Sequence, residues 1–330
     1  MLNNKNILIT GGTGSFGKAF IQIITNRYKK IKKLVILSRD ELKQAELKAT
    51  YPEKKYPFIR FYLGDIRDYQ RLLRALDGID IVVHAAALKQ VPTAEIDPFE
   101  FIKTNVMGSQ NLIEACLERR VKNVVALSTD KAAAPINLYG ATKLCADKLF
   151  SSANNIKGNR DIKFSVVRYG NVFGSRGSVV PIFLEANLKK ESFKVTDVNM
   201  SRFNISLKDG VEAVLWTIQN SFGGEIIVPK IPSYKILDVV KAINDKAKIT
   251  ITGIRPGEKI FEEMITEHDS VTTYDIGKYY IILNPSNTKL INKYKKYKKF
   301  PKGKSYNSRD NQSFLKIAEI KNLIQKHIKN

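Results

Sequence analysis

Two short stretches near the middle of the chain carry side chains that could do acid–base chemistry. One is Thr129-Asp130-Lys131, and the other carries Tyr139 and Lys143 four positions apart. On a helix this spacing puts both side chains on one face. An ammonium group beside a phenol stabilises the phenolate, so Tyr139 could act as a base below the ordinary tyrosine pKa of about 10. An unreactive tyrosine–lysine pair on an exposed helix is the alternative.

The segments around these stretches place them at a ligand-binding edge. The apolar run in Lys122–Ser128 predicts a buried strand, and a helix is expected from about Tyr139 to Asn154. Thr129–Lys131 therefore follows the carboxyl end of a strand, where open α/β sheets bind ligands. A plain surface turn is the alternative interpretation of this segment.

A glycine-rich turn near the start of the chain predicts a dinucleotide site. Lys5–Thr10 reads as a buried strand, and Gly11, Gly14 and Gly17 follow it and open an amphipathic helix that reaches about Tyr28. Glycines allow a tight turn and close backbone approach, and free N–H groups at the helix start bind a pyrophosphate. A structural turn without a ligand is the alternative.

The second predicted strand, Lys33–Leu37, leads into residues that distinguish the two nicotinamide dinucleotides. Arg39 lies 22 residues beyond Gly17 and suits the 2′-phosphate of NADP, and Lys43 adds a second cation. Asp40 is an acid of the kind that holds ribose hydroxyls in NAD sites. NADP is the predicted cofactor, and NAD is the alternative.

The alternation of elements predicts the fold class. Further buried strands are expected at Phe58–Leu63, Ile79–His84 and Lys163–Arg168, and a helix is expected from about Pro98 to Arg120. Strands that alternate with helices favour an α/β fold, here a doubly wound parallel sheet of the Rossmann type with right-handed crossovers. Within these elements, His84 is predicted to be a packed core histidine, and the amide of Asn105 is expected to brace the active-site loop.

Beyond the last of these strands the sequence predicts a smaller C-terminal substrate domain. The stretch Tyr169–Ser178 is polar and rich in glycine, a composition that is typical of ligand-binding loops. Arg202 and Ile254–Lys259 supply cations that could clamp a diphosphate or could simply be solvated. The elements expected here are helices at Val179–Lys190, Ser206–Gln219 and Asn311–Lys329 and a strand at Phe193–Thr196.

The predicted domain division follows from this change of pattern. Residues 1–170 plus about 201–224 are expected to form the dinucleotide-binding domain, and residues 171–200 plus about 225–330 the substrate domain.

Composition narrows the classes of function. The chain has 330 residues, of which 43% are hydrophobic and 26% charged, as in globular proteins. It has no apolar run long enough for a membrane span and no signal-peptide pattern at its start, so a cytoplasmic location is expected. The scattered histidines and the cysteines Cys116 and Cys145 predict neither a metal site nor a disulfide framework. The net charge of +23 raises the possibility of nucleic-acid binding, but the lysines are spread along the chain, and their densest cluster, 289–304, is expected to be solvated.

The glycine turn and the later tyrosine–lysine pair together resemble the extended short-chain dehydrogenase/reductase family. More narrowly, ITGGTGSFG, SRDELKQ, HAAALKQVP, STDKAAAPINLYGATK, RYGNVFGSRGSVVP and IRPGEK are similar to the inverting UDP-N-acetylglucosamine 4,6-dehydratases that begin pseudaminic acid synthesis. The similarity runs to at least Glu263. The chain departs from the family pattern at two places. Phe101 stands where the family would have a small or sulfur-bearing residue, and Asn199-Met200-Ser201-Arg202 replaces the usual Met-Thr-Arg. A capsule-type subgroup replaces the tyrosine, so Tyr139 favours the pseudaminate group.

The resemblance implies a reaction and a role for each catalytic candidate. The sugar is oxidised at C4, water is eliminated across C5–C6, and hydride returns to C6. Tyr139, with Lys143, would take the C4 hydroxyl proton, and Thr129 would hydrogen-bond the C4 oxygen. Asp130 would be a protonated acid for the C6 hydroxyl, and Lys131 a neutral base for the C5 proton. Retaining dehydratases carry an Asp-Glu pair here, so Asp-Lys points to inversion at C5.

Residues and resemblance together predict two contact sets and no metal ligands. The cofactor set is Gly11, Thr13, Gly14, Ser15, Phe16, Gly17, Ser38, Arg39, Asp40, Lys43, Asp65, Ile66, Ala85, Ala86, Ala87, Lys89, Asn105, Tyr139, Lys143 and Val172. The substrate set is Lys89, Asn171, Ser178, Val179, Thr196, Met200, Arg202, Arg255 and Glu258.

Several alternatives share part of this pattern. A UDP-sugar 4-epimerase would keep the glycines and Tyr139 but has no use for an acid and a base at Asp130 and Lys131. A retaining dehydratase would share the elimination, and a non-catalytic NADP-binding regulator would keep only the glycine turn. The resemblance further implies a homo-oligomer, with a hexamer as the suggested form, and flagellin glycosylation as the destination of the product.

Overall fold

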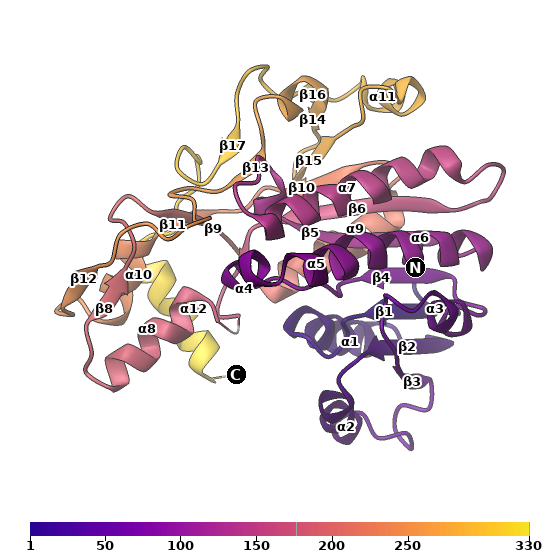
Figure 1. The fold of residues 1–330 in the computed structure, drawn as a ribbon, viewed down its shortest axis with the longest axis horizontal. Coiled ribbons are helices and arrows are strands. Elements are labelled where there is room, and N and C mark those ends of the chain that lie inside the picture. Colours follow the sequence, from indigo (N-terminus) through magenta and orange to yellow (C-terminus); the bar gives the residue numbers. More distant parts are fainter. Residues whose placement is uncertain (176, 330) are drawn as a thin grey trace.

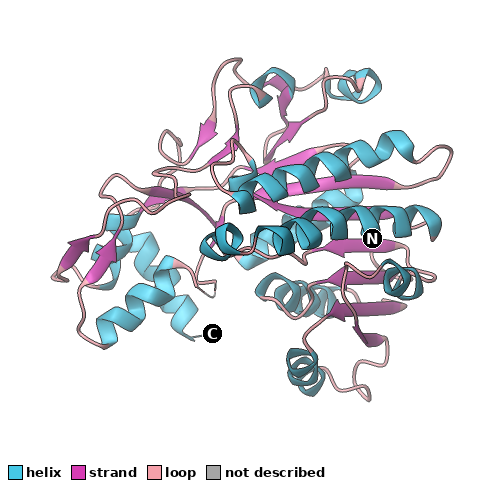
Figure 2. Cartoon of the chain, viewed as in Figure 1, coloured by secondary structure: helices cyan, strands magenta, loops and turns pink. Residues whose placement is uncertain are grey.

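The computed structural model describes residues 1–175 and 177–329 of the chain, so Arg176 of the predicted ligand loop lies outside the described residues. A large twisted sheet with helices on both faces forms one side of the molecule, and a smaller group of helices and short strands lies beside it (Figures 1 and 2). Within the described part, no helix combines the length and apolar character that crossing a lipid bilayer requires.

The large sheet confirms the predicted fold class. Its strand order is β16-β14-β15-β10-β6-β5-β4-β1-β2-β3, and the run from β3 to β10 is parallel throughout. The order 3-2-1-4-5-6 within this run is that of a doubly wound dinucleotide-binding sheet. The strands are β1 Asn6–Thr10, β2 Lys33–Ser38, β3 Ile59–Leu63, β4 Ile81–His84, β5 Asn123–Thr129, β6 Lys163–Tyr169, β10 Ile226–Pro229, β14 Thr273–Asp275, β15 Tyr279–Ile282 and β16 Lys298–Lys299.

Helices pack on both faces of this sheet, with α1 against α9 and α6 against α7. The predicted helix from Pro98 to Arg120 is interrupted by a wider π-helical turn at Ile102–Met107 that contains Asn105. The final helix begins later than predicted, because Asn311 and Leu315 instead hydrogen-bond to the chain around β11. The helices are α1 Ser15–Arg27, α2 Glu41–Thr50, α3 Tyr69–Ala75, α4 Val91–Ile96, α5 Pro98–Phe101, α6 Gly108–Glu118, α7 Leu138–Ile156, α8 Val179–Leu188, α9 Leu207–Asn220, α10 Ile236–Ile243, α11 Thr288–Tyr294 and α12 Ile317–Lys329.

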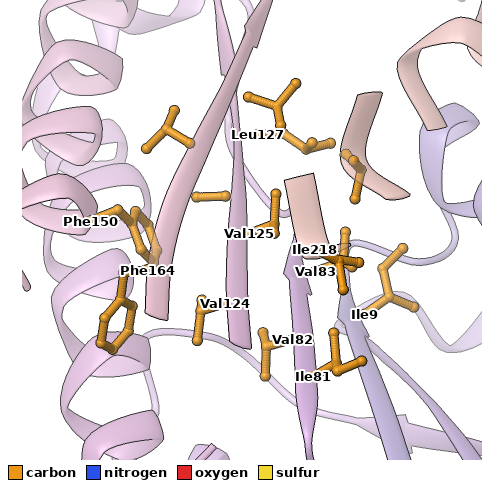
Figure 3. Close-up of a cluster of buried hydrophobic side chains, with 14 of the residues drawn as sticks. Ile9, Ile81, Val82, Val83, Val124, Val125, Leu127, Phe150, Phe164 and Ile218 are labelled. Atoms are coloured by element: carbon orange, nitrogen blue, oxygen red, sulfur yellow. The ribbon is translucent and has the colours of Figure 1, made fainter. Parts of the chain in front are cut away.

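The main core lies on both faces of the parallel strands. Figure 3 shows Val82 of β4, Val124 of β5, Phe164 of β6 and Phe150 of α7 in one buried cluster that also includes Ile218 of α9. Strands covered on both faces need nearly continuous apolar sequence, which explains the run in β5. Each fully buried side chain of this size contributes about 1.5–3 kcal/mol, so the strand ends that carry the predicted site residues are firmly supported.

A second core holds the smaller part together. It joins side chains from α8, α10 and α12, including Phe183, Val239 and Ile320, with Phe193 of β8. The short strands of the chain are β7 Asn171–Val172, β8 Phe193–Val195, β9 Ser201–Ile205, β11 Ser233–Lys235, β12 Ile249–Ile251, β13 Glu263–Ile265 and β17 Tyr306–Asn307.

The predicted domain boundary differs from the observed sheet in one respect. The sequence assigns residues from about 225 onward to the substrate domain, but β10, β14, β15 and β16 all extend the large sheet. Ile226 of β10 pairs with Val166 of β6, which continues the parallel ladder. The lysine-rich region 289–304 is exposed at its lysines, as predicted, yet Lys298–Lys299 pairs with β14 as the edge strand β16.

Candidate active site

A sharp turn brings the predicted catalytic residues together. Thr129 is the last residue of β5, and Asp130–Ala132 forms a single 3₁₀ turn that leads toward α7. A Cβ atom at Gly140 of α7 would lie 2.3 Å from the carbonyl oxygen of Lys131. Because only glycine fits there, α7 can lie directly against the turn. The side chain of Asn137 caps α7 by accepting from the N–H of Gly140 at 2.7 Å.

Asp130 and Lys131 form an ion pair in which Asp130 is buried and Lys131 is half-buried, rather than the surface turn of the alternative interpretation. Asp130 is 0% exposed, and its Oδ1 accepts from Thr129 Oγ1 at 2.9 Å and from Lys131 Nζ at 3.1 Å. Lys131 Nζ also donates to Asn171 Oδ1 at 3.3 Å and lies 3.2 Å from Glu262 Oε1. The 3₁₀ turn, β7 and the chain before β13 therefore meet at one ammonium group.

The protonation states of this pair agree with the predicted roles only in part. Burial raises the pKa of Asp130, with Glu262 adding to the effect and Lys131 opposing it, which favours the protonated acid that the resemblance implies. Burial lowers the pKa of Lys131, but Asp130 and Glu262 outweigh burial and hold it above its ordinary value. The structure thus differs from the expectation of a neutral lysine, because two carboxylates face its ammonium group.

Tyr139 lies beside the same cluster, but its electrostatic partner differs from the prediction. Burial raises the pKa of Tyr139 to about 12, and the cation that opposes this rise is Lys131. Lys143 Nζ instead donates to the carbonyl oxygen of Leu127 at 2.8 Å. Thr129 is a hydrogen-bonding neighbour of Tyr139. The helix spacing does put Tyr139 and Lys143 in one buried region, but it does not make Lys143 the group that stabilises the phenolate here.

The glycine turn has the shape that a dinucleotide requires. Gly11 has a φ of 66°, and a Cβ there would lie 2.8 Å from the backbone of Ala85 and Ala86. Gly17 packs so closely on Gly12 that a Cβ would lie 2.4 Å away. The N-cap of α1 is Gly14, whose lack of a side-chain cap leaves the first N–H groups for an anion. These residues fit a pyrophosphate.

The residues predicted to select NADP are engaged with carboxylates. Arg39 Nη1 lies 3.3 Å from Asp65 Oδ2, and Lys43 pairs with Asp40, the N-cap of α2. Ser38 Oγ lies 2.9 Å from Thr13 Oγ1, which joins the glycine turn to the end of β2. The structure thus places Arg39, Lys43 and the acids Asp40 and Asp65 near the end of β2.

Other predicted cofactor residues occupy several environments. Asn105 does brace the loop after β4: its Oδ1 accepts from the N–H of Leu88 and its Nδ2 donates to the Leu88 carbonyl, both at 2.9 Å. Ile66 is buried against Gly108, whereas Lys89 is exposed. The remaining positions are Ser15 and Phe16 in the first turn of α1, partly buried Ala85 and Ala86, exposed Ala87, and Val172 in β7.

His84 has the predicted core role. Its side chain is 2% exposed, and its Nδ1 lies 2.8 Å from Thr10 Oγ1. Burial lowers the pKa of His84 to about 3, so the imidazole is neutral and acts as a hydrogen-bonded part of the core.

The predicted substrate residues separate into an inner and an outer group. Arg202 is buried, with Nη2 3.7 Å from Glu258 Oε1 and Nε 3.8 Å from Glu262 Oε1, so it borders the Asp130–Lys131 pair. Arg255 lies 3.8 Å from Glu258 but is 67% exposed. The others border the second core: Ser178 is the N-cap of α8, Val179 begins it, Thr196 follows β8, and Met200 is buried in the core.

The most informative residue that the sequence did not single out is Glu262. It lies just beyond the motif IRPGEK, and only its proximity to that motif could have drawn attention to it. Gly170 was also missed as a site residue: a Cβ there would lie 2.3 Å from Phe203 Cβ and 3.4 Å from Asp130 Oδ2. Asn137 completes the group, because its Nδ2 donates to the Gly257 carbonyl at 2.7 Å and ties IRPGEK to α7.

Known sequences match the chain over nearly its whole length. The family model for polysaccharide biosynthesis proteins matches residues 7–284. The inverting UDP-N-acetylglucosamine 4,6-dehydratase of Campylobacter jejuni serotype O:2 is 49% identical over 98% of this chain and 98% of its own. A UDP-glucose 4-epimerase from Rickettsia canadensis is 38% identical over 100% of both chains.

Solved structures show the same fold. The structure of Pen from Bacillus thuringiensis superposes with a TM-score of 0.88 at 35% identity, covering 98% of this chain and 99% of its own. The dTDP-glucose 4,6-dehydratase DesIV from Streptomyces venezuelae, solved with NAD, superposes with a TM-score of 0.68 at 23% identity, covering 77% of this chain and 86% of its own. The predicted family and fold are thus confirmed: the chain is an enzyme that belongs to the extended short-chain dehydrogenase/reductase family, in the branch of the polysaccharide biosynthesis proteins.

Proposed function

We propose that the chain is a UDP-N-acetylglucosamine 4,6-dehydratase that inverts C5 and uses NADP. Its product would be UDP-2-acetamido-2,6-dideoxy-β-L-arabino-hex-4-ulose. The observation that carries the proposal is the ion pair of buried Asp130 and half-buried Lys131 at the carboxyl end of β5, beside Tyr139. An acid and a base at this place serve an elimination, whereas a 4-epimerase needs only the tyrosine. The Campylobacter relative supports the same reaction.

The first step depends on Tyr139 and Thr129. NADP held at the glycine turn of Gly11, Gly14 and Gly17 would supply the hydride chemistry of the cycle. Tyr139 takes the proton of the C4 hydroxyl, and Thr129 hydrogen-bonds the C4 oxygen. Because burial holds the pKa of Tyr139 near 12, a cation must favour its phenolate, and Lys131 is the cation that acts on it here.

The elimination depends on moving one proton between Asp130 and Lys131. Their resting ion pair and the reactive pair of protonated acid and neutral amine carry the same number of protons. Transfer across the 3.1 Å contact interconverts them. The raised pKa of Asp130 favours the reactive form, whereas the raised pKa of Lys131 favours the ion pair. Lys131 then takes the C5 proton as Asp130 gives its proton to the C6 hydroxyl, which leaves as water.

The substrate's diphosphate would bind at the inner arginine. Arg202 is buried between Glu258 and Glu262, at the edge of the Asp130–Lys131 pair. A buried guanidinium holds a phosphate in a bidentate manner. The remaining substrate contacts on α8 and β8 rest on the resemblance.

The choice of NADP over NAD rests on Arg39 and Lys43. Both cations lie at the end of β2, where a 2′-phosphate would displace Asp65 and Asp40 from them. DesIV was solved with NAD, so NAD is the competing outcome. Denaturing the purified protein and chromatographing the released nucleotide tests this: recovery of NADP(H) supports the Arg39 argument, and recovery of NAD alone contradicts it.

Product analysis tests the reaction itself. The protein, incubated with UDP-N-acetylglucosamine in deuterated water and followed by NMR, should release a 4-keto-6-deoxy sugar that is labelled and inverted at C5. Retention at C5 would make the chain a retaining dehydratase. A product that keeps all its oxygens and is inverted at C4 would make it an epimerase, the activity named for the Rickettsia relative.

The biological setting stays a proposal carried by the resemblance alone. It comprises the first step of pseudaminic acid synthesis, flagellin glycosylation, a cytoplasmic location and a homo-oligomer of hexameric form. The proposal also includes the catalytic, cofactor and substrate roles given above and the division into two domains.

A further inference from the structure

Lys131 has one acceptor for each of its N–H bonds. An ammonium group carries three donors, and Nζ lies 3.1 Å from Asp130 Oδ1, 3.2 Å from Glu262 Oε1 and 3.3 Å from Asn171 Oδ1. When Lys131 loses a proton, two N–H bonds remain and one direction becomes a lone pair. The two acceptors that keep their N–H bonds therefore decide where that lone pair points.

Glu262 is held rigidly in this arrangement. Its backbone N–H donates to Ser308 Oγ at 3.0 Å, and its carbonyl accepts from the N–H of Ser308 at 2.8 Å. The residue is 2% exposed, and its Oε2 has no hydrogen-bond partner among the described residues. A buried carboxylate with a fixed backbone and one unpartnered oxygen is costly unless it serves a ligand or a reaction.

We propose that Glu262 is the positioning residue for Lys131, the base of the reaction. Glu262 and Asn171 accept the two N–H bonds that Lys131 keeps when it loses a proton. The lone pair of Lys131 is thereby directed toward Asp130 and the C5 proton of the substrate. This inference rests on the proposed function. Asp130 is the acceptor that changes, because it exchanges its proton with the amine, whereas Glu262 and Asn171 stay fixed on other elements.

Glu262 also sets the charge around the amine. Its carboxylate is one of two that raise the pKa of Lys131 against the lowering effect of burial. The other titratable or charged groups that face Lys131 and Glu262 are Asp130, Tyr139, Arg202, Tyr234, Glu258 and Lys259. Removing the charge of Glu262 while leaving these groups in place must lower the pKa of Lys131. The neutral amine would then form at lower pH but would be less well directed.

The test is Glu262→Gln, with the neighbouring Glu263→Gln as the matched control. Incorporation of deuterium at C5 is followed as a function of pH, and C4 oxidation is followed separately as nicotinamide absorbance. Glu262→Gln should slow C5 exchange by about 10- to 100-fold, the size expected for a lost charge-assisted hydrogen bond. It should move the acidic limb of the pH profile to lower pH and leave both C4 oxidation and KM within about twofold of wild type. Glu263→Gln should match wild type in all four measurements.

A second variant separates loss of the charge from a purely structural effect of Glu262→Gln. Adding Asn171→Asp to Glu262→Gln moves the carboxylate to the other fixed acceptor of Lys131, and it should return the acidic limb toward the wild-type position. Unchanged C5 exchange in Glu262→Gln, or C4 oxidation lost to the same extent as C5 exchange, would overturn the inference. If the wild-type enzyme itself yields no C5-labelled product from UDP-N-acetylglucosamine, the proposed function fails, and that result is separate from any effect of Glu262.

Discussion

Two buried clusters of charge lie close together in this protein, and their hydrogen bonding differs. The anchor cluster is Arg168 with Asp147, Ser128 and Asp269. Asp147 Oδ2 accepts from Arg168 Nε at 3.2 Å, from Arg168 Nη2 at 3.0 Å and from Ser128 Oγ at 2.8 Å. Arg168 Nη1 also donates to the carbonyl of Met264 at 3.0 Å. This cluster ties β5, β6 and α7 to β13.

The reaction cluster is Lys131 with Asp130, Glu262 and Arg202. Asp130 Oδ2 and Glu262 Oε2 have no partner among the described residues, and the Lys131 side chain is 25% exposed although both carboxylates are buried. A fully paired buried cluster stabilises a fold, whereas unpartnered acceptors lower stability and leave capacity for a ligand or a proton. The comparison predicts that the anchor cluster contributes stability and the reaction cluster contributes rate.

The largest expected effect is on rate, from Lys131→Ala. Loss of the base should reduce formation of the dehydrated sugar by about 10³-fold, or about 4 kcal/mol. Hydride transfer from C4 should be slowed much less and still appear as nicotinamide absorbance, because Tyr139 remains as the base for that step and loses only the cation that favours its phenolate. Lys148→Ala, on the exposed part of α7, is the control and should keep wild-type turnover. Dehydrated product at an undiminished rate from Lys131→Ala would show that another group removes the C5 proton.

The two aspartates allow a direct test of the comparison by stability. Asp147→Asn leaves Arg168 buried without its main carboxylate and should lower the free energy of unfolding by about 3 kcal/mol. Asp130→Asn should change it by less than about 1 kcal/mol, because Lys131 is partly exposed and keeps Glu262 as a partner, and because burial already opposes the charge of Asp130. Urea denaturation measures both. Equal losses would mean that the two clusters have the same structural role.

A pair of glycines tests whether close packing builds the reaction cluster. Gly140→Ala places a Cβ against the Lys131 carbonyl and should cost about 1–3 kcal/mol of stability together with activity. Gly210→Ala, in α9, meets nothing nearer than 3.8 Å and should instead stabilise the protein by about 0.5–1 kcal/mol. Thermal unfolding and turnover of both variants decide the matter, and a tolerated Gly140→Ala would show that α7 can move away from the turn.

The last expected effect is a pH dependence of stability that belongs to neither cluster. The pKa of His84 falls from 6.5 to about 3 through burial, with a further contribution from Lys143. A folded-state pKa below the unfolded value gives stability that is present above pH 6.5 and is lost as the pH falls toward 3. The slope is up to about 1.4 kcal/mol per pH unit. His84→Gln should remove that slope between about pH 6 and pH 5 in denaturation experiments, and equal slopes would contradict the assignment.

Much of the fold was predictable because its signals are local. The glycine turn between Lys5–Thr10 and the helix to about Tyr28, and the apolar run of β5, follow from spacing and from strands covered on both faces. The catalytic candidates Thr129–Lys131 and Tyr139 were identifiable for the same reason, since each is placed by an element that precedes or contains it. The break in the helix after Phe101 and the late start of α12 were not, because a π-turn and a tertiary hydrogen bond override helix periodicity.

The sequence by itself determined the fold class, the family and the residue types at the end of β5. Tertiary structure alone decided which charge faces which. Lys143 lies four residues from Tyr139, yet its ammonium group donates to the Leu127 carbonyl. Lys131 is instead the cation that opposes the rise in the pKa of Tyr139. Glu262 lies 131 residues beyond Lys131 in the sequence but 3.2 Å from it in space. Burial and through-space charge set the pKa of a side chain, and neither can be read from spacing along the chain.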